Sequence, residues 1–112
     1  MKGITTHVLD LASGQPAQDL SVRLDRLAGS GWDRVAERTT DIDGRVKDLH
    51  LGPQIEKGVY RLTFAVRRYY HGKGIPTFYP EVQVMFDVGD ASQHYHVPLL
   101  LSPYGYSTYR GS

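Results

Sequence analysis

Cysteine is absent from the 112-residue chain, and its absence removes several classes of chemistry at once. Without thiols the protein has no disulfide framework, no thiolate metal site and no cysteine nucleophile. The sequence also lacks an apolar run long enough to span a membrane. Because the amino-terminal MKGITTHVLD shows no signal-peptide pattern, we expect a cytoplasmic protein that does not bind membranes.

Neither sign of charge dominates. Thirteen Lys and Arg residues are interleaved with twelve Asp and Glu residues, and the formal net charge is +1. A nucleic-acid-binding protein usually gathers its basic residues into a stripe, so we expect no nucleic-acid partner. The remaining composition is that of a globular protein, and the length predicts a single domain over residues 1–112.

Three catalytic motifs are missing as well. The chain has no GxSxG nucleophile elbow, no GxxxxGKS phosphate loop and no GxGxxG dinucleotide loop. What remains is acid–base and electrostatic chemistry, carried by histidine and arginine. The five histidines are His7, His50, His71, His94 and His96.

The pattern of the chain predicts β-strands. Twelve glycines and six prolines separate short β-branched and aromatic runs. Residues 59–68 alternate most clearly, and a single helical turn could follow before Gly72. Further strands are expected over residues 4–11, 21–27, 33–40, 80–88 and 94–101. About seven or eight short strands predict an antiparallel sandwich.

Two of these segments bear on function. The Asp43-Gly44 pair favours a tight turn, which would place Arg45 just after it. The strand over 94–101 is apolar on both faces in its later part. One face can pack inside the sandwich, so we expect another copy of the chain to cover the other.

Several histidine and arginine residues are candidates for chemistry. His7 lies in a strand, either as a packed residue or as a functional one. His94 and His96 share a strand face, where a third histidine would complete a zinc site. Two histidines at this spacing are common by chance, so an exposed His94 beside a half-buried His96 is the favoured interpretation. Arg45 and Arg110 are candidates to hold an anionic or carbonyl-rich substrate.

The carboxy-terminal segment ends in YSTYRGS. A last strand with packed aromatics explains the tyrosines up to Tyr109, but not Arg110, Gly111 and Ser112. A docked tail would supply a negative charge, a hydroxyl and a cation together. We therefore expect these residues to be folded against the protein.

Four segments taken together resemble the 5-hydroxyisourate hydrolases of the transthyretin-like family. They are TTHVLD at 5–10, DGR at 43–45, FYPEV at 78–82 and HYHVPLLLSPYGYSTYRGS at 94–112. The resemblance runs over the whole chain. The closing YRGS separates the hydrolases from transthyretin, the thyroid-hormone carrier of the same fold.

The resemblance implies an all-β, transthyretin-like (prealbumin-like) antiparallel β-sandwich of about eight strands with one short helix. It also implies a homotetramer, built as a dimer of dimers, with active sites where the dimers meet. The implied reaction is the hydrolysis of 5-hydroxyisourate to 2-oxo-4-hydroxy-4-carboxy-5-ureidoimidazoline in urate breakdown. Neither a cofactor nor a metal is expected.

The residues that the resemblance implies fall into two overlapping sets. The catalytic residues are His7, Arg45, His96 and Ser112, and the substrate-binding residues are His7, Arg45, Tyr109, Arg110, Gly111 and Ser112. The histidines would activate water or polarise the substrate, with the general base left open between them. Two alternatives stand beside this hypothesis: a non-catalytic carrier of a small aromatic ligand, and a zinc hydrolase using His94 and His96.

Overall fold

A computed structural model describes residues 3–50 and 55–112 of the chain. Within those residues it contains nine strands and one helix. Their bounds are β1 Gly3–Asp10, β2 Gln15–Pro16, β3 Ser21–Ala28, β4 Gly31–Thr39, β5 Arg45–His50, β6 Gly58–Phe64, α1 Val66–His71, β7 Val82–Val88, β8 His94–Ser102 and β9 Gly105–Thr108.

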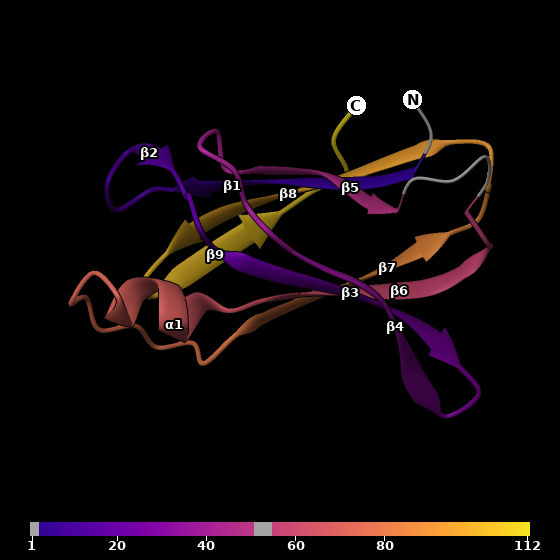
Figure 1. The fold of residues 1–112 in the computed structure, drawn as a ribbon, viewed down its shortest axis with the longest axis horizontal. Coiled ribbons are helices and arrows are strands. Elements are labelled where there is room, and N and C mark those ends of the chain that lie inside the picture. Colours follow the sequence, from indigo (N-terminus) through magenta and orange to yellow (C-terminus); the bar gives the residue numbers. More distant parts are fainter. Residues whose placement is uncertain (1–2, 51–54) are drawn as a thin grey trace.

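The strands form two layers, with α1 at one end (Figure 1). One sheet has the order β2-β1-β8-β9, and β5 pairs with the same edge of β1 as β2 does. The other sheet has the order β4-β3-β6-β7. Among the described strands every pairing is antiparallel except that of β1 with β8. The predicted antiparallel sandwich is confirmed, with this one parallel pair inside it.

The core lies between the sheets and follows the alternation seen in the sequence. Val22 and Leu24 of β3 are fully buried, as are Leu62 and Phe64 of β6. Successive side chains on a strand point to opposite faces, so each strand contributes every second residue to this layer. Burying one such side chain contributes about 1.5–3 kcal/mol to the free energy of unfolding.

The strand predicted over residues 59–68 is wrong in its last part, because β6 ends at Phe64 and α1 begins at Val66. Val66, Tyr69 and Tyr70 are buried on one side of this helix, at helical spacing. Packing of that stripe overrides the β-branched and aromatic composition of the segment. The helical turn expected before Gly72 is confirmed.

Asp10 fixes the helix to the first sheet. Its carboxylate is buried and accepts hydrogen bonds from the hydroxyls of Tyr69 and Tyr70, at 2.8 and 2.9 Å. Burial raises the pKa of both tyrosines, and the hydrogen bonds to Asp10 and its charge raise it further. Both hydroxyls therefore stay protonated and keep donating.

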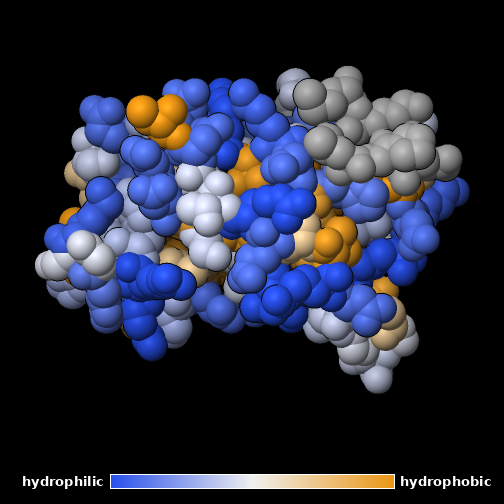
Figure 2. All heavy atoms as spheres, viewed as in Figure 1, coloured by the Kyte–Doolittle hydropathy of each residue, from blue (hydrophilic) through white to orange (hydrophobic). Residues whose placement is uncertain are grey.

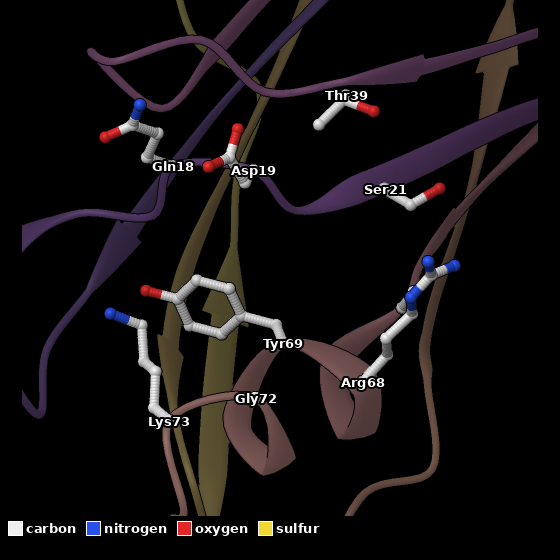
Figure 3. A pocket seen from close by; sticks show the side chains of 9 residues that line it. Gln18, Asp19, Ser21, Thr39, Arg68, Tyr69, Gly72 and Lys73 are labelled. Carbon is white, nitrogen blue, oxygen red and sulfur yellow. The ribbon is translucent and has the colours of Figure 1, made fainter.

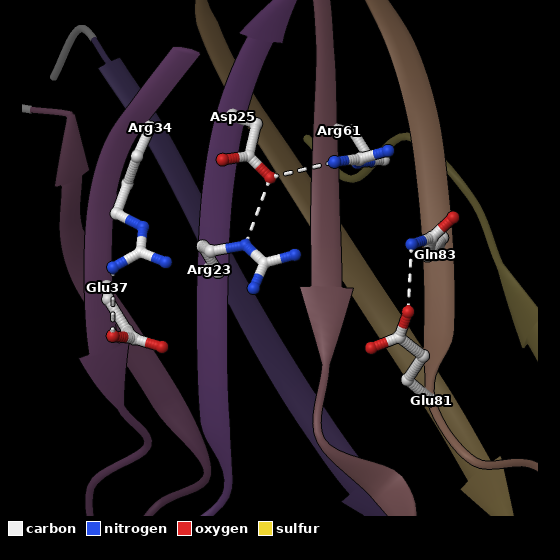
Figure 4. Close-up of polar contacts among 7 residues, drawn as sticks. All are labelled: Arg23, Asp25, Arg34, Glu37, Arg61, Glu81 and Gln83. Atoms are coloured by element: carbon white, nitrogen blue, oxygen red, sulfur yellow. Dashed lines mark hydrogen bonds and ion pairs between the residues drawn. The ribbon is translucent and has the colours of Figure 1, made fainter. Parts of the chain in front are cut away.

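Ion pairs cover the outer face of the second sheet (Figure 4). Asp25 lies on this face but is only 4% exposed, because Arg23 and Arg61 lie over it. Its Oδ2 atom accepts hydrogen bonds from Arg23 Nε at 3.1 Å and Arg61 Nη2 at 3.2 Å. The Arg61 guanidinium also lies 4.2 Å from the centre of the Trp32 ring. The Asp25 carboxylate on this face is therefore paired with arginines of the same sheet.

Hydrophilic residues cover most of the molecular face in Figure 2, and hydrophobic atoms show only in separate small areas. Isolated exposed apolar side chains of this kind are normal for a globular protein. No helix in the described part of the chain is long and apolar enough to cross a membrane.

Candidate active site

A tight turn over residues 41–44 places Arg45 at the start of β5. The Asp41 carboxylate accepts hydrogen bonds from the backbone N–H groups of Arg45 and Asp43, each at 2.9 Å. These bonds lower the pKa of Asp41, the bond from Arg45 having the largest effect. The turn predicted from Asp43-Gly44 is thus present, and Arg45 follows it as expected.

Gly44 docks this turn against β1. It has a φ of +75°, and its carbonyl accepts the N–H of Val8 at 2.7 Å. A Cβ atom at this position would collide with the Val8 carbonyl oxygen. Only glycine combines this conformation with so close an approach. The docked turn sets the β1–β5 register, in which His7 lies opposite Arg45.

Thr5 joins two histidines of the neighbouring strand β8. Its Oγ1 atom lies 2.9 Å from Nε2 of His94 and 2.7 Å from Nδ1 of His96. The parallel β1–β8 pairing places Thr5 opposite His96, on the face that also carries His7. The two histidines therefore share one hydroxyl group.

Both of these imidazoles are held toward the neutral form. Burial lowers the pKa of His96, and the charges of His94, Arg45 and His7 lower it further. Burial also lowers the pKa of His94, with a contribution from the charge of Arg110. A neutral imidazole near pH 7 can accept a proton, as a general base must.

The carboxy-terminal tail is folded against His96. The Gly111 N–H donates to the His96 carbonyl oxygen at 2.8 Å, in an antiparallel bridge. A Cβ atom on Gly111 would lie 2.6 Å from Cδ2 of the His96 ring. Glycine is required here by this close contact, which brings the following residue, Ser112, beside the histidine.

These groups surround a hollow of about 240 Å³ on the outer face of the first sheet, which we name the basic hollow. Its lining residues are Thr5, Thr6, Arg45, Lys47, His94, His96 and Ser112. No acidic side chain lines it among the residues that the structure describes. A guanidinium, an ammonium and neutral imidazoles together suit a small anionic or carbonyl-rich molecule.

The structure brings together only some of the predicted site residues. Arg45, His96 and Ser112 line the basic hollow, and His7 lies opposite Arg45. Arg110 points elsewhere: its Nη2 atom is 2.7 Å from Oε1 of Gln93, and its guanidinium lies over the Tyr95 ring.

Tyr109 and Arg110 line a different hollow, beside β7. Tyr109 is 58% exposed. Thr5 was missed from the sequence, although the two-residue spacing from His7 in TTHVLD places it on the same strand face.

A larger hollow of about 550 Å³ lies between α1 and the chain before β3 (Figure 3). Arg68 and Lys73 lie on its helix side, and Gln18 and Asp19 lie across from them. It shares no lining residue with the basic hollow. The predicted site residues therefore favour the smaller hollow as the candidate active site.

The zinc alternative finds no complete ligand set. Across residues 3–50 and 55–112, no three His, Cys, Asp or Glu side chains gather as a metal site would require. His94 and His96 instead share the hydroxyl of Thr5.

Comparison with known proteins identifies the family of the chain. The model of the HIUase/Transthyretin family matches residues 4–111. The chain belongs to this family. It is 48% identical to the 5-hydroxyisourate hydrolase of Mus musculus, over 97% of this chain and 94% of that protein.

Two solved structures of the HIUase/Transthyretin family share the fold. The 5-hydroxyisourate hydrolase of Klebsiella pneumoniae superposes with a TM-score of 0.86 at 34% identity, covering 97% of this chain and 98% of that one. Sea bream transthyretin, solved with thyroxine, gives 0.90 at 31% identity, covering 96% and 93%. The resemblance inferred from four sequence segments is confirmed.

Proposed function

We propose that this protein hydrolyses 5-hydroxyisourate to 2-oxo-4-hydroxy-4-carboxy-5-ureidoimidazoline, a step of urate breakdown, without a cofactor. The observation that carries the proposal is the basic hollow, where neutral His96, Arg45 and the folded tail meet. A 5-hydroxyisourate hydrolase is among the relatives of this chain, at 48% identity over 97% of its length. The hollow supplies the groups that water attack on a ring carbonyl requires.

Each residue has a role in this mechanism. His96 accepts the proton of the attacking water, because its imidazole is neutral and lines the hollow. Arg45 holds the substrate through paired hydrogen bonds and stabilises the developing oxyanion. His7, opposite Arg45, polarises the substrate, and Ser112 limits its position in the hollow.

An absorbance assay on freshly oxidised urate tests this function. The wild-type protein should speed the decay of the hydroxyisourate absorbance well above the spontaneous rate. Deleting residues 109–112 should remove most of that acceleration, because the Gly111 bridge and Ser112 are lost. Decay at the spontaneous rate with wild-type protein would favour the carrier alternative instead.

We also propose that the protein works as a homotetramer, a dimer of dimers, with the outer face of β8 in an interface. Leu9 of β1 and Leu100 of β8 are opposite each other in the sheet, and both are only half-buried in a single chain. This apolar pair lies on the same face as the basic hollow. A second copy covering it would also exclude water from the hollow.

Light scattering at micromolar concentration tests the assembly. A tetramer's mass is expected for the wild-type protein. Leu100→Glu should shift the mass toward smaller species, because a carboxylate would then have to be buried in the interface. A wild-type monomer would exclude the proposed assembly.

A further inference from the structure

We propose that Thr5 and His94 form a proton relay behind His96, so that the positive charge created by water attack moves away from Arg45. The geometry is a chain of three groups: His96 Nδ1, Thr5 Oγ1 at 2.7 Å, and His94 Nε2 at 2.9 Å. Both distances lie within the usual range for hydrogen bonds. This relay rests on the proposed hydrolysis, and it assigns positioning roles to two residues.

A single hydroxyl can donate to one imidazole nitrogen and accept from the other in two ways, since it carries one proton and two lone pairs. In the first, Thr5 donates to His94 Nε2 and accepts from His96 Nδ1–H, which leaves His96 Nε2 without a proton. In the second, Thr5 donates to His96 Nδ1 and accepts from His94 Nε2–H. The first arrangement is the one ready for catalysis, because the free His96 Nε2 can act as a base.

The proton steps balance. An O–H bond of water breaks as its oxygen bonds to the substrate carbonyl carbon, and the proton goes to His96 Nε2. The Nδ1 proton of His96 passes to Thr5 Oγ1, and the Thr5 hydroxyl proton passes to His94 Nε2. His94 becomes the imidazolium, while His96 and Thr5 stay neutral. The carbonyl oxygen carries the negative charge.

The reverse transfer completes the reaction. When the ring C–N bond breaks, His96 donates its Nε2 proton to the departing nitrogen, which takes the bonding electron pair. The extra proton of His94 returns through Thr5 to His96 Nδ1. The site is then as it began, and the elements of one water have been added to the substrate.

The sheet register gives the reason for moving the charge. Arg45 lies in the row of His7 and Pro98, whereas His96 is two positions along β8 and His94 is four. At about 3.3 Å per residue, the relay moves the charge roughly 7 Å further from the guanidinium. Repulsion between this charge and Arg45 is reduced accordingly. Arg110, whose Nη2 atom lies 3.4 Å from the His94 carbonyl oxygen, opposes the charge at its new position, so the proton rests on His94 only until it returns. The charges of Arg45 and His7 are among the causes that lower the pKa of His96.

Two variants break the relay at different points. Thr5→Val keeps the shape of the side chain and removes the hydroxyl. His94→Gln keeps an acceptor for the Thr5 hydroxyl but cannot take up its proton. Each should lower kcat by about 10- to 100-fold, a part of the typical effect of general acid–base catalysis. KM should stay within about twofold, and Thr5→Ser should restore kcat to within about threefold.

A proton inventory in mixtures of light and heavy water separates a relay from a structural role. The wild-type enzyme should give a curved plot, because more than one proton moves in the rate-limiting step, and His94→Gln should give a straight line. Thr5→Val combined with His94→Gln should cost no more than either alone. Thr63→Val is the matched control: that buried threonine lies on the other sheet, and its hydroxyl has no hydrogen-bond partner among the described residues.

The outcomes distinguish the relay from the function on which it rests. Wild-type protein that fails to speed hydroxyisourate decay would overturn the proposed function. Wild-type kcat and a curved inventory in both relay variants, with full activity in the wild-type protein, would overturn the relay alone. If Thr5→Val does not fold, as judged by circular dichroism, His94→Gln decides by itself, because His94 is only half-buried.

Discussion

The outer faces of the two sheets differ in whether their positively charged side chains are paired with carboxylates. On the second sheet Arg23 and Arg61 share the Asp25 carboxylate, and Arg34 lies 3.7 Å from Glu37 (Figure 4). On the first sheet the charged groups of the basic hollow form no ion pair with any carboxylate within residues 3–50 and 55–112. The cations of the second sheet's outer face are paired with carboxylates, whereas those of the basic hollow are available to a ligand.

This difference separates a structural surface from a functional one. Cations held beside one another without an acidic side chain to pair with repel. Burial lowers the pKa of His96, and the charges of His94, Arg45 and His7 lower it further. Such an arrangement lowers stability unless binding or catalysis compensates for it. The arginines over Asp25 are paired with its carboxylate and do not lower stability in this way, so they do not indicate a ligand-binding site.

Of the substitutions on the two faces, His96→Ala should cause the largest loss of activity. Loss of the neutral imidazole removes the base from the hollow, so kcat should fall by about 10²- to 10⁴-fold. The fold should survive, because the side chain lies on the outer face. Steady-state kinetics on hydroxyisourate with circular dichroism checks both expectations. A loss below about tenfold would remove His96 from the chemistry.

Replacing one arginine on each face compares directly how much an unpaired and a paired arginine contribute to activity. Arg45→Ala should lower kcat/KM by about 10- to 100-fold, since charge-assisted hydrogen bonds to the substrate are lost. Arg34→Ala is the matched control on the other sheet, where an exposed pair contributes little. Equal activity of the two variants in the same kinetic assay would mean that unpaired charge does not mark the site.

Gly111→Ala should act through the tail alone. The added methyl would meet the His96 ring at 2.6 Å, so the tail must move and Ser112 leaves the hollow. We expect about a tenfold loss of kcat/KM, because positioning is disturbed while the base remains. The thermal midpoint should change little. Unchanged kinetics would show that the tail does not position the substrate.

Asp25→Asn is the reciprocal change on the paired face. Arg23 and Arg61 would lose their shared carboxylate, whose side chain is 6% exposed. The free energy of unfolding should fall by about 1–3 kcal/mol, measured by urea titration. Activity at a temperature where the variant is folded should stay within about twofold. A large loss of kcat without loss of stability would contradict the claim that the paired face has only a structural role.

A smaller effect follows from the lowered pKa of His94 and His96. The unfolded chain binds protons at these groups more readily than the folded protein below about pH 6.5, so stability rises with pH through this window. The contribution is fully present above about pH 6.5 and declines as the pH falls. Thermal midpoints between pH 8 and 5 check this sign. A smaller decline in His96→Gln would assign part of it to His96.

The fold was largely predictable because its strands alternate strongly and its turns carry clear signals. Leu62 and Phe64 follow the alternation into the core, and Asp43-Gly44 forms the turn that places Arg45. The segment after Phe64 was predicted less well, since composition there favours a strand while packing against Asp10 favours a helix.

The site was predictable only as far as local pattern reaches. Gly111 and Ser112 were expected to be folded against the protein. Gly111 forms a bridge with His96, and Ser112, although exposed, lines the basic hollow. The link from Thr5 to His94 spans 89 positions in the sequence and depends on the parallel β1–β8 pairing, which no local pattern indicates. The direction of the Arg110 side chain depends in the same way on Gln93 and Tyr95.

The most direct test of the central claim is the decay of hydroxyisourate absorbance in three parallel samples: buffer, wild-type protein and His96→Ala at equal concentration. The account predicts rapid decay with the wild-type protein and nearly spontaneous decay with the variant. Equal rates in all three samples, from proteins shown to be folded, would contradict the claim that the basic hollow is a hydrolytic site.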